Sequence, residues 1–166
     1  MPDHEPLDPD FAPRVRASFA RQAFMRTIGA ELTRVEPGEV EIVLPFRDDL
    51  TQQHGYLHAA AVTAIVDSAC GYAAMTLAEA GAGVLTVEYK ANFLSPAAGD
   101  RMRASARVLR RGRSLTVCAG EVHAESPAGE RHVVTMIATI AVVAGRAERG
   151  PGDDLTPASP APTPPA

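Results

Sequence analysis

Tryptophan is absent from this 166-residue chain, aromatic residues make up 5% of it, and lysine occurs once, at Lys90, beside fifteen arginines. Acidic residues outnumber basic ones by 20 to 16, and without a basic excess nucleic acid is not expected as the main partner. The two cysteines, Cys70 and Cys118, have no paired spacing, which excludes a disulfide framework and suits free thiols in a reducing compartment. No GxSxG segment occurs, so a serine hydrolase would lack its nucleophile elbow.

The two ends of the chain have little to bury. Residues 1–13 contain four prolines, three aspartates and one glutamate, which predicts a flexible arm with none of the character of a secretory signal. Residues 145–166 contain six prolines, which predicts a disordered tail. Between them, residues 14–144 are enough for one domain with one core, and we expect the protein to be cytoplasmic.

A long apolar segment from His58 to Ala80 dominates the middle of the chain. It has no proline and is apolar on every face, which predicts a helix of about six turns that is buried on all sides. A bilayer span is the alternative, but the segment is mostly alanine with Thr, Ser, Gly and a mid-length Asp67, so we expect no membrane partner. A carboxylate in such a helix is costly to desolvate, so Asp67 requires a partner, water or a ligand.

The other segments predict a sheet around this helix. A short amphipathic helix is expected over Arg14–Thr27, ended by Gly29. In the segment from Arg101, apolar and polar residues alternate cleanly, whereas the last segment is apolar on both faces and belongs inside the sheet. Strands are predicted over residues 30–35, 39–46, 84–94, 101–109, 114–125 and 132–144. This order of elements is typical of an α+β fold with an antiparallel sheet wrapped around one long helix.

The residues around His58 resemble a known family motif. Gly55-Tyr56-Leu57-His58-Ala59-Ala60, with Asp67 nine residues after His58, resembles the hot-dog-fold thioesterases of the phenylacetate-degradation (PaaI-like) type. Their pattern is Asn, a short gap, Gly-x-x-His-Gly-Gly, then Asp in the long helix. Here Gln52 stands in place of the Asn, and Ala59-Ala60 replaces the glycine pair. The likeness runs from about Phe24 to Val143 and is closest to a branch acting on medium- to long-chain acyl-CoA.

The resemblance implies a hot-dog fold and hydrolysis of acyl-CoA thioesters without a cofactor. It also implies that Gly55 binds substrate and that Thr86, nine residues before the strand-ending Ser95-Pro96, lies in the site.

The spacing of His58 and Asp67 carries an argument of its own. Nine helical residues correspond to a rise of roughly 13 Å and a rotation of roughly 900 degrees, so the two side chains cannot serve one site in one chain. Two copies of the helix packed about a two-fold axis would create two equivalent sites at their interface. We therefore expect a homodimer, which can pair further into a tetramer.

Each candidate residue has a functional and a structural interpretation. Asp67 is a general base or nucleophile, or a structural carboxylate bonded to backbone or arginine. The backbone N–H of Ala59, at the first turn of the helix, can polarise the thioester oxygen. His58 orients the site or donates to substrate rather than acting as a base, and Gln52 holds water or the carbonyl. Thr86 either hydrogen-bonds Asp67 or is a β-branched strand residue.

Two further clusters were weighed as binding sites. Arg110, Arg111 and Arg113 at a predicted hairpin suit the phosphates of coenzyme A, or are a solvated turn. His54 and His58 form an HxxxH pair, but Gly55 disfavours a helix there and no third ligand is evident, so no metal is expected.

The sequence thus predicts an acyl-CoA thioesterase acting on medium- to long-chain or aryl acyl groups at sites shared across a homodimer. A non-catalytic acyl-CoA-binding regulator with the same fold is the alternative. A hot-dog dehydratase is disfavoured because its His-Phe-Pro signature is absent.

Overall fold

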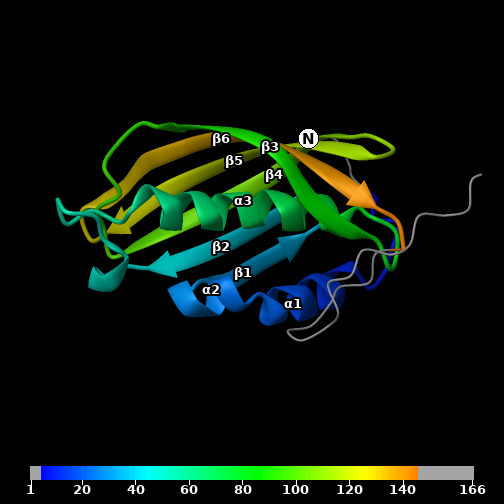
Figure 1. The fold of residues 1–166 in the computed structure, drawn as a ribbon, viewed down its shortest axis with the longest axis horizontal. Helices are drawn as coiled ribbons and strands as arrows, with labels where there is room; N and C mark the ends of the chain where they lie inside the picture. The colour runs from blue at the N-terminus through cyan, green and yellow to red at the C-terminus, as the bar shows by residue number, and fades with distance from the viewer. Residues whose placement is uncertain (1–4, 146–166) are drawn as a thin grey trace, which may run out of the picture.

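Six antiparallel strands form a single sheet, and a long helix lies across one of its faces (Figure 1). The computed structural model describes residues 5–145. The order along the sheet is β1-β2-β4-β5-β6-β3, so the chain crosses the whole sheet between β2 and β3 by way of α3. The elements are α1 (Phe11–Arg21), α2 (Ala23–Ile28), β1 (Glu31–Glu36), β2 (Glu39–Pro45), η1 (Asp48–Leu50), α3 (Ala59–Thr76), β3 (Gly83–Phe93), β4 (Arg101–Arg111), β5 (Leu115–Ser126) and β6 (Gly129–Val143).

This architecture confirms the predicted α+β fold. Short turns join β1 to β2, β4 to β5 and β5 to β6, whereas β3 follows the helix and pairs with β6 at the far edge of the sheet. Strand β6 lies inside the sheet between β5 and β3, as its apolar character on both faces predicts. The predicted alternation in β4 is also correct, with its small and apolar residues facing α3: Met102, Ala104, Ala106 and Val108 are buried.

Helix α3 is covered along its C-terminal half, where α1 packs over it. Ser18 of α1 hydrogen-bonds the hydroxyl of Tyr72, and Phe19 makes an edge-to-face contact with the Tyr72 ring. The N-terminal half has no such cover, and a stripe of small residues there is half-buried: Thr63, Ala64, Asp67, Ser68 and Gly71. The prediction of burial on all sides is therefore wrong for this half. By length and composition α3 could cross a bilayer, but it packs as the core helix of the sheet, so this is weak evidence for a membrane span.

The predicted N-terminal helix is divided into two helices. Its backbone breaks at Gln22, where ψ is 95°, so that Val15 and Ser18 on α1 and Met25 and Ile28 on α2 can all be buried. Gly29 then ends α2 at a φ of 77°, as predicted.

The predicted N-terminal arm is in part packed against the domain. Asp8 is buried because it pairs with Arg14 at 2.8 Å, and α1 begins at Phe11, inside the segment predicted to be flexible. The guanidinium of Arg14 donates to the carbonyl of Met75 in the last turn of α3 and to the carbonyls of Ala78 and Ala82 beyond it. The predicted tail lies outside the described residues from 146 onward, as do residues 1–4 of the arm.

Gly120 of β5 lies directly beneath α3. A Cβ built there would be 2.5 Å from Cγ2 of Val66 and 3.0 Å from the Cys70 sulfur. Substituting Gly120→Ala should therefore push the helix off the sheet and lower the free energy of unfolding by about 1–3 kcal/mol, measured by urea denaturation. Ala119→Val is the control, because it enlarges a half-exposed side chain on the opposite face of the same strand. Equal losses of stability in the two variants would contradict this account of Gly120.

Candidate active site

The start of α3 carries one free hydrogen-bond donor. His58 is the N-cap, and its Nδ1 accepts from the N–H of Ala60 at 3.0 Å, so that nitrogen is occupied. The carbonyl of His58 takes the N–H groups of Ala61 and Val62. Within residues 5–145, no acceptor lies at hydrogen-bond distance from the N–H of Ala59. This N–H can bind an oxygen that develops negative charge.

The loop before the helix is a tight turn that presents Gln52. Thr51 and Leu57 form an isolated bridge, and Gly55 closes the turn by donating to the carbonyl of Gln52 at 3.0 Å. The φ of Gly55 is 79°, a left-handed conformation that glycine adopts easily and other residues rarely adopt. A Cβ at this position would have no atom of a non-adjacent residue within 4 Å, so the backbone conformation and not lack of space favours glycine here. The side-chain oxygen of Gln52 accepts from the N–H of His54, so its Nε2 hydrogens are what this residue can offer a ligand.

Gln52 and Ala59 border the same hollow, which has a volume of about 460 Å³. The sequence predicted both residues and the Ser95-Pro96 pair, but it did not single out the aromatic walls formed by Tyr56 and Phe93. Both rings are exposed although they are large and apolar, a signal that becomes visible once the fold is known. The hollow is lined by Gln52, Tyr56, Leu57, Ala59, Phe93, Leu94, Ser95, Pro96 and Ala97.

Asp67 lies in a separate place, on the half-buried stripe of α3. The hydroxyl of Thr86 on β3 donates to Oδ1 of Asp67 at 2.8 Å, the contact that the sequence offered as one alternative for Thr86. Burial raises the pKa of the Asp67 carboxyl from its ordinary value, and the hydrogen bond from Thr86 lowers it again in part. A carboxylate with a raised pKa is a stronger base than an exposed one, and no residue from 5 to 145 donates a hydrogen bond to its second oxygen, which can accept a proton.

A bulge in β3 decides which residues face the helix. The pairing of β3 with β6 shifts between Thr86 and Glu88, so Val87 is the extra residue. Thr86 therefore points to α3, whereas Glu88 accepts from Thr139 on the opposite face of the sheet.

The free N–H of Ala59 and the carboxylate of Asp67 are far apart within one chain. Ala59 and Asp67 are eight residues apart on one helix, which corresponds to a rise of about 12 Å. Asp67 does not line the hollow that Gln52 and Ala59 border. One chain thus holds two different halves of the candidate site.

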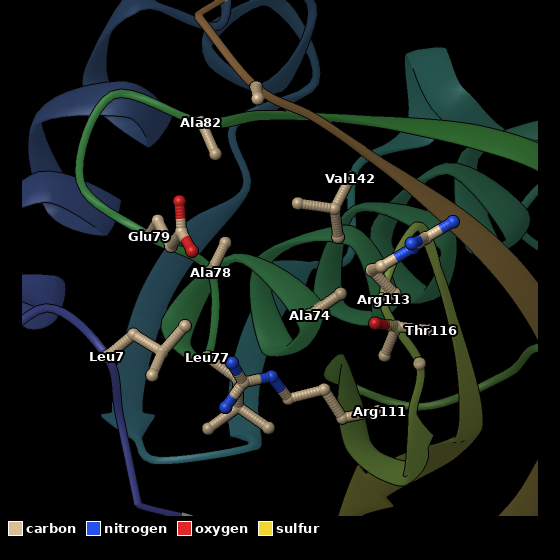
Figure 2. A pocket seen from close by; sticks show the side chains of 12 residues that line it. Leu7, Ala74, Leu77, Ala78, Glu79, Ala82, Arg111, Arg113, Thr116 and Val142 are labelled. Carbon is tan, nitrogen blue, oxygen red and sulfur yellow. The ribbon is translucent and has the colours of Figure 1, made fainter.

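The arginine cluster lies at the opposite end of α3. Arg111 and Arg113 line a cavity of about 210 Å³ beside Leu77 and Ala78, with Glu79 on another wall (Figure 2). Arg110 is exposed on β4 and does not line this cavity. In one chain the cluster is separated from the hollow by the length of the helix, which is about 27 Å for 18 residues.

The face of the protein beside these half-sites is apolar. Strand β3 is an edge strand, and within the described part of the chain it pairs with β6 on one side alone. Large side chains on it are exposed: Leu85 at 46%, Val87 at 58%, Tyr89 at 45% and Phe93 at 47%.

Comparison with known proteins agrees with this geometry. A profile of the Thioesterase superfamily matches residues 54–130, which include Gly55, α3 and Thr86. The crystal structure of a thioesterase family protein from Silicibacter pomeroyi is 49% identical and has a TM-score of 0.80, covering 81% of this chain and 99% of that one. A Thermoplasma volcanium protein named for an inferred esterase activity is 32% identical over 58% of this chain and 72% of its own length.

The PaaI protein from the phenylacetic acid degradation operon of E. coli has the same fold. It is 18% identical with a TM-score of 0.75, covering 86% of this chain and 99% of that one, a likeness that concerns the fold alone. The motif, the sheet wrapped around one helix and these similarities lead to one conclusion: the chain belongs to the thioesterase superfamily and is a PaaI-like hot-dog thioesterase, a hydrolase of acyl thioesters.

Proposed function

We propose that this thioesterase hydrolyses acyl-CoA, with medium- to long-chain or aryl acyl groups, at two equivalent sites shared between the subunits of a cytoplasmic homodimer. Dimers can pair further into tetramers. The observation that carries this proposal is the separation of the free N–H of Ala59 from the carboxylate of Asp67 along a single helix. Hydrolysis needs both groups at one thioester, and a second chain can supply the group that the first chain lacks at that place.

A two-fold axis near Thr63 would bring the two halves together. When two α3 helices lie antiparallel about an axis level with residue 63, Ala59 of one chain is level with Asp67 of the other. The half-buried stripe of small residues is what such close packing of helices requires. The open edge of β3 and its exposed apolar residues support the same interface, because an uncovered edge of this kind is a template for pairing.

The chemistry then follows from the groups present. The thioester oxygen accepts from the Ala59 N–H and from Nε2 of Gln52, while Asp67 of the partner subunit attacks the carbonyl carbon or removes a proton from water. If water attacks, Asp67 takes its proton and returns it to the sulfur as the C–S bond breaks, which gives the free acid and the thiol. If Asp67 attacks, the C–S bond breaks to give an acyl anhydride on Asp67, and water then hydrolyses the anhydride to the free acid, restores the carboxylate and supplies the proton of the thiol. His58 accepts at Nδ1, so its neutral ring carries a proton on Nε2 and can donate to substrate. Thr86 holds Oδ1 of Asp67 and leaves Oδ2 for the reaction.

Removing the Thr86 hydroxyl should move the pH profile of the reaction. The hydrogen bond from Thr86 opposes the effect of burial on the pKa of Asp67, so Thr86→Val should raise this pKa further. Because Asp67 acts when ionised, the acidic limb of kcat/KM should move to higher pH. Thr139→Val is the matched control, since it removes a hydroxyl that donates to Glu88 on the other face at 2.6 Å. An unchanged limb in Thr86→Val would exclude the proposed role.

The arginine cluster should act on coenzyme A and not on the acyl group. An antiparallel dimer places Arg111 and Arg113 of one chain beyond the N-terminus of the partner's α3, on the side where a long cofactor would extend. Arg111→Ser with Arg113→Ser should therefore raise KM for acyl-CoA about tenfold. It should leave KM unchanged for the corresponding acyl-pantetheine, which lacks the phosphates. Arg16→Ser on α1 is the control, and an equal effect on both substrates would contradict the assignment.

Release of free thiol from a panel of acyl-CoAs tests the activity and the acyl preference. The panel should include short, medium, long and aryl acyl groups, and the proposal predicts the largest kcat/KM outside the short ones. Tight binding of acyl-CoA with no release of thiol would favour the non-catalytic regulator instead. Preference for acetyl-CoA would refute the proposed substrate class while leaving the chemistry intact.

A further inference from the structure

Three side chains that could bind a metal ion gather on the face of the sheet opposite α3. Glu121 and His123 belong to β5 and His132 to β6, and their ligand atoms all lie within 4.8 Å of one another. The helix-facing residues of β5 alternate with them: Gly120, Val122 and Ala124 are buried. The cluster is therefore separated from the candidate active site by the sheet itself.

A bulge creates this cluster. The pairing of β5 with β6 shifts between Val122 and His123, so that Val122 pairs with Val134 and His123 with His132. Val133 takes the extra position and is buried, which turns His132 to the same face as His123. The two imidazole rings stack with their centroids 4.7 Å apart and an interplanar angle of 14°.

Hydrogen bonding leaves the histidine nitrogens suited to a metal. Nε2 of His132 lies 2.8 Å from the carbonyl oxygen of Val134, and because a carbonyl accepts, this nitrogen must carry the proton. The lone pair of His132 is then on Nδ1, and an N–H held by a carbonyl is the usual support of a metal-binding imidazole. Nδ1 of His123 is buried and has no hydrogen-bond partner within residues 5–145. A buried nitrogen in this state is costly, and a ligand would relieve it.

The local charge also permits a cation. Arg103 lies opposite His123 in the register of β4 and β5, and its positive charge would oppose a cation. Three carboxylates form ion pairs with this guanidinium and offset its charge: those of Glu125 at 2.5 Å, Glu130 at 2.9 Å and Glu41 at 3.7 Å. Glu121 is exposed and makes no hydrogen bond or ion pair with any other described residue. Its carboxylate is therefore free to bind.

We propose that Glu121, His123 and His132 form a site for a borderline divalent transition-metal ion of the Zn²⁺ type. Two imidazoles and a carboxylate, with water in the fourth position, are a ligand set that Zn²⁺ takes. Bonds of about 2.1 Å in a tetrahedral site require ligand atoms roughly 3.4 Å apart, which rotation of the exposed Glu121 side chain and small ring movements can supply. The ion would tie β5 to β6 on the side away from the thioester chemistry.

Zinc titration of the full-length, EDTA-treated protein tests this site. Calorimetry should detect one strong site per chain, and zinc should raise the thermal unfolding midpoint. Glu121→Gln and His132→Gln should each weaken the binding at least about tenfold and abolish the rise in midpoint. Both variants should unfold like wild type in EDTA, which shows that the fold is intact.

His54→Gln is the matched control, since it removes an exposed histidine elsewhere. It should bind zinc like wild type. Loss of binding in His54→Gln, equal binding in all variants, or no binding by wild type would each overturn the proposal. Thioesterase activity in EDTA is a separate readout, so failure of the metal site and failure of the proposed acyl-CoA hydrolysis are distinguishable.

Discussion

Asp67→Asn should lower kcat for acyl-CoA hydrolysis by about 10²–10⁴-fold, because it replaces the carboxylate that attacks or takes a proton from water. The amide has the same shape and can still accept the hydrogen bond from Thr86. KM should therefore change little. Steady-state kinetics with the preferred acyl-CoA measures both parameters.

The same variant should be more stable than wild type at neutral pH. Burial raises the pKa of Asp67 in the folded protein, so ionisation of this carboxyl lowers the free energy of unfolding. The loss builds up as the pH rises from the ordinary pKa of aspartate to the raised pKa and is constant above it. The asparagine removes this penalty, and its advantage should shrink as the pH falls below the raised pKa and vanish below the ordinary one. Activity loss accompanied by unfolding would instead indicate a structural Asp67.

Ala59→Pro should lower kcat by about 10²–10³-fold, the effect expected when one donor to a developing oxyanion is removed. Proline removes the backbone N–H of this residue without removing a side-chain group that takes part in the reaction. It is also favoured at the first position of a helix. His58 before it has a ψ of 139°, which is compatible with a following proline. Thermal unfolding of the variant should stay close to that of wild type.

Ala59→Gly is the matched control for this effect. It changes the side chain of the same residue but keeps the N–H, and it restores the glycine of the PaaI-like motif. Its kcat should stay within about threefold of wild type, since the side chain has no part in binding the oxygen. If the proline variant were as active as the glycine variant, the oxygen would have to be bound elsewhere.

Strand patterning predicted most of the fold because the sheet has one buried face. In β4 the alternation of Met102, Ala104 and Ala106 with arginine and serine specifies which side meets α3, and the structure agrees. The errors come from breaks and bulges in the backbone that no characteristic residue type marks in the sequence. The break at Gln22 involves neither proline nor glycine, and the bulge at Val87 puts Thr86 and Glu88 on opposite faces, where regular alternation would put both on one face.

The residues of the candidate site and their separation within one chain were predictable, but the shape of the hollow was not. The motif identifies Gln52, Ala59 and Asp67, and the helical spacing already separates Asp67 from the helix start, as the structure shows. Phe93 was missed because an aromatic residue in a strand is ordinary until its exposure is known. The His123–His132 pair was missed as well, since a bulge in β6 brings these residues together.

Mixing two inactive variants tests the shared site most directly. In a heterodimer of Asp67→Asn with Ala59→Pro, one site combines the intact N–H of the first chain with the intact carboxylate of the second. Random exchange makes half of all dimers heterodimers with one working site of two, so about one quarter of wild-type activity should return. If each chain held a complete site, the mixture would stay as inactive as its two components, and the account would be wrong.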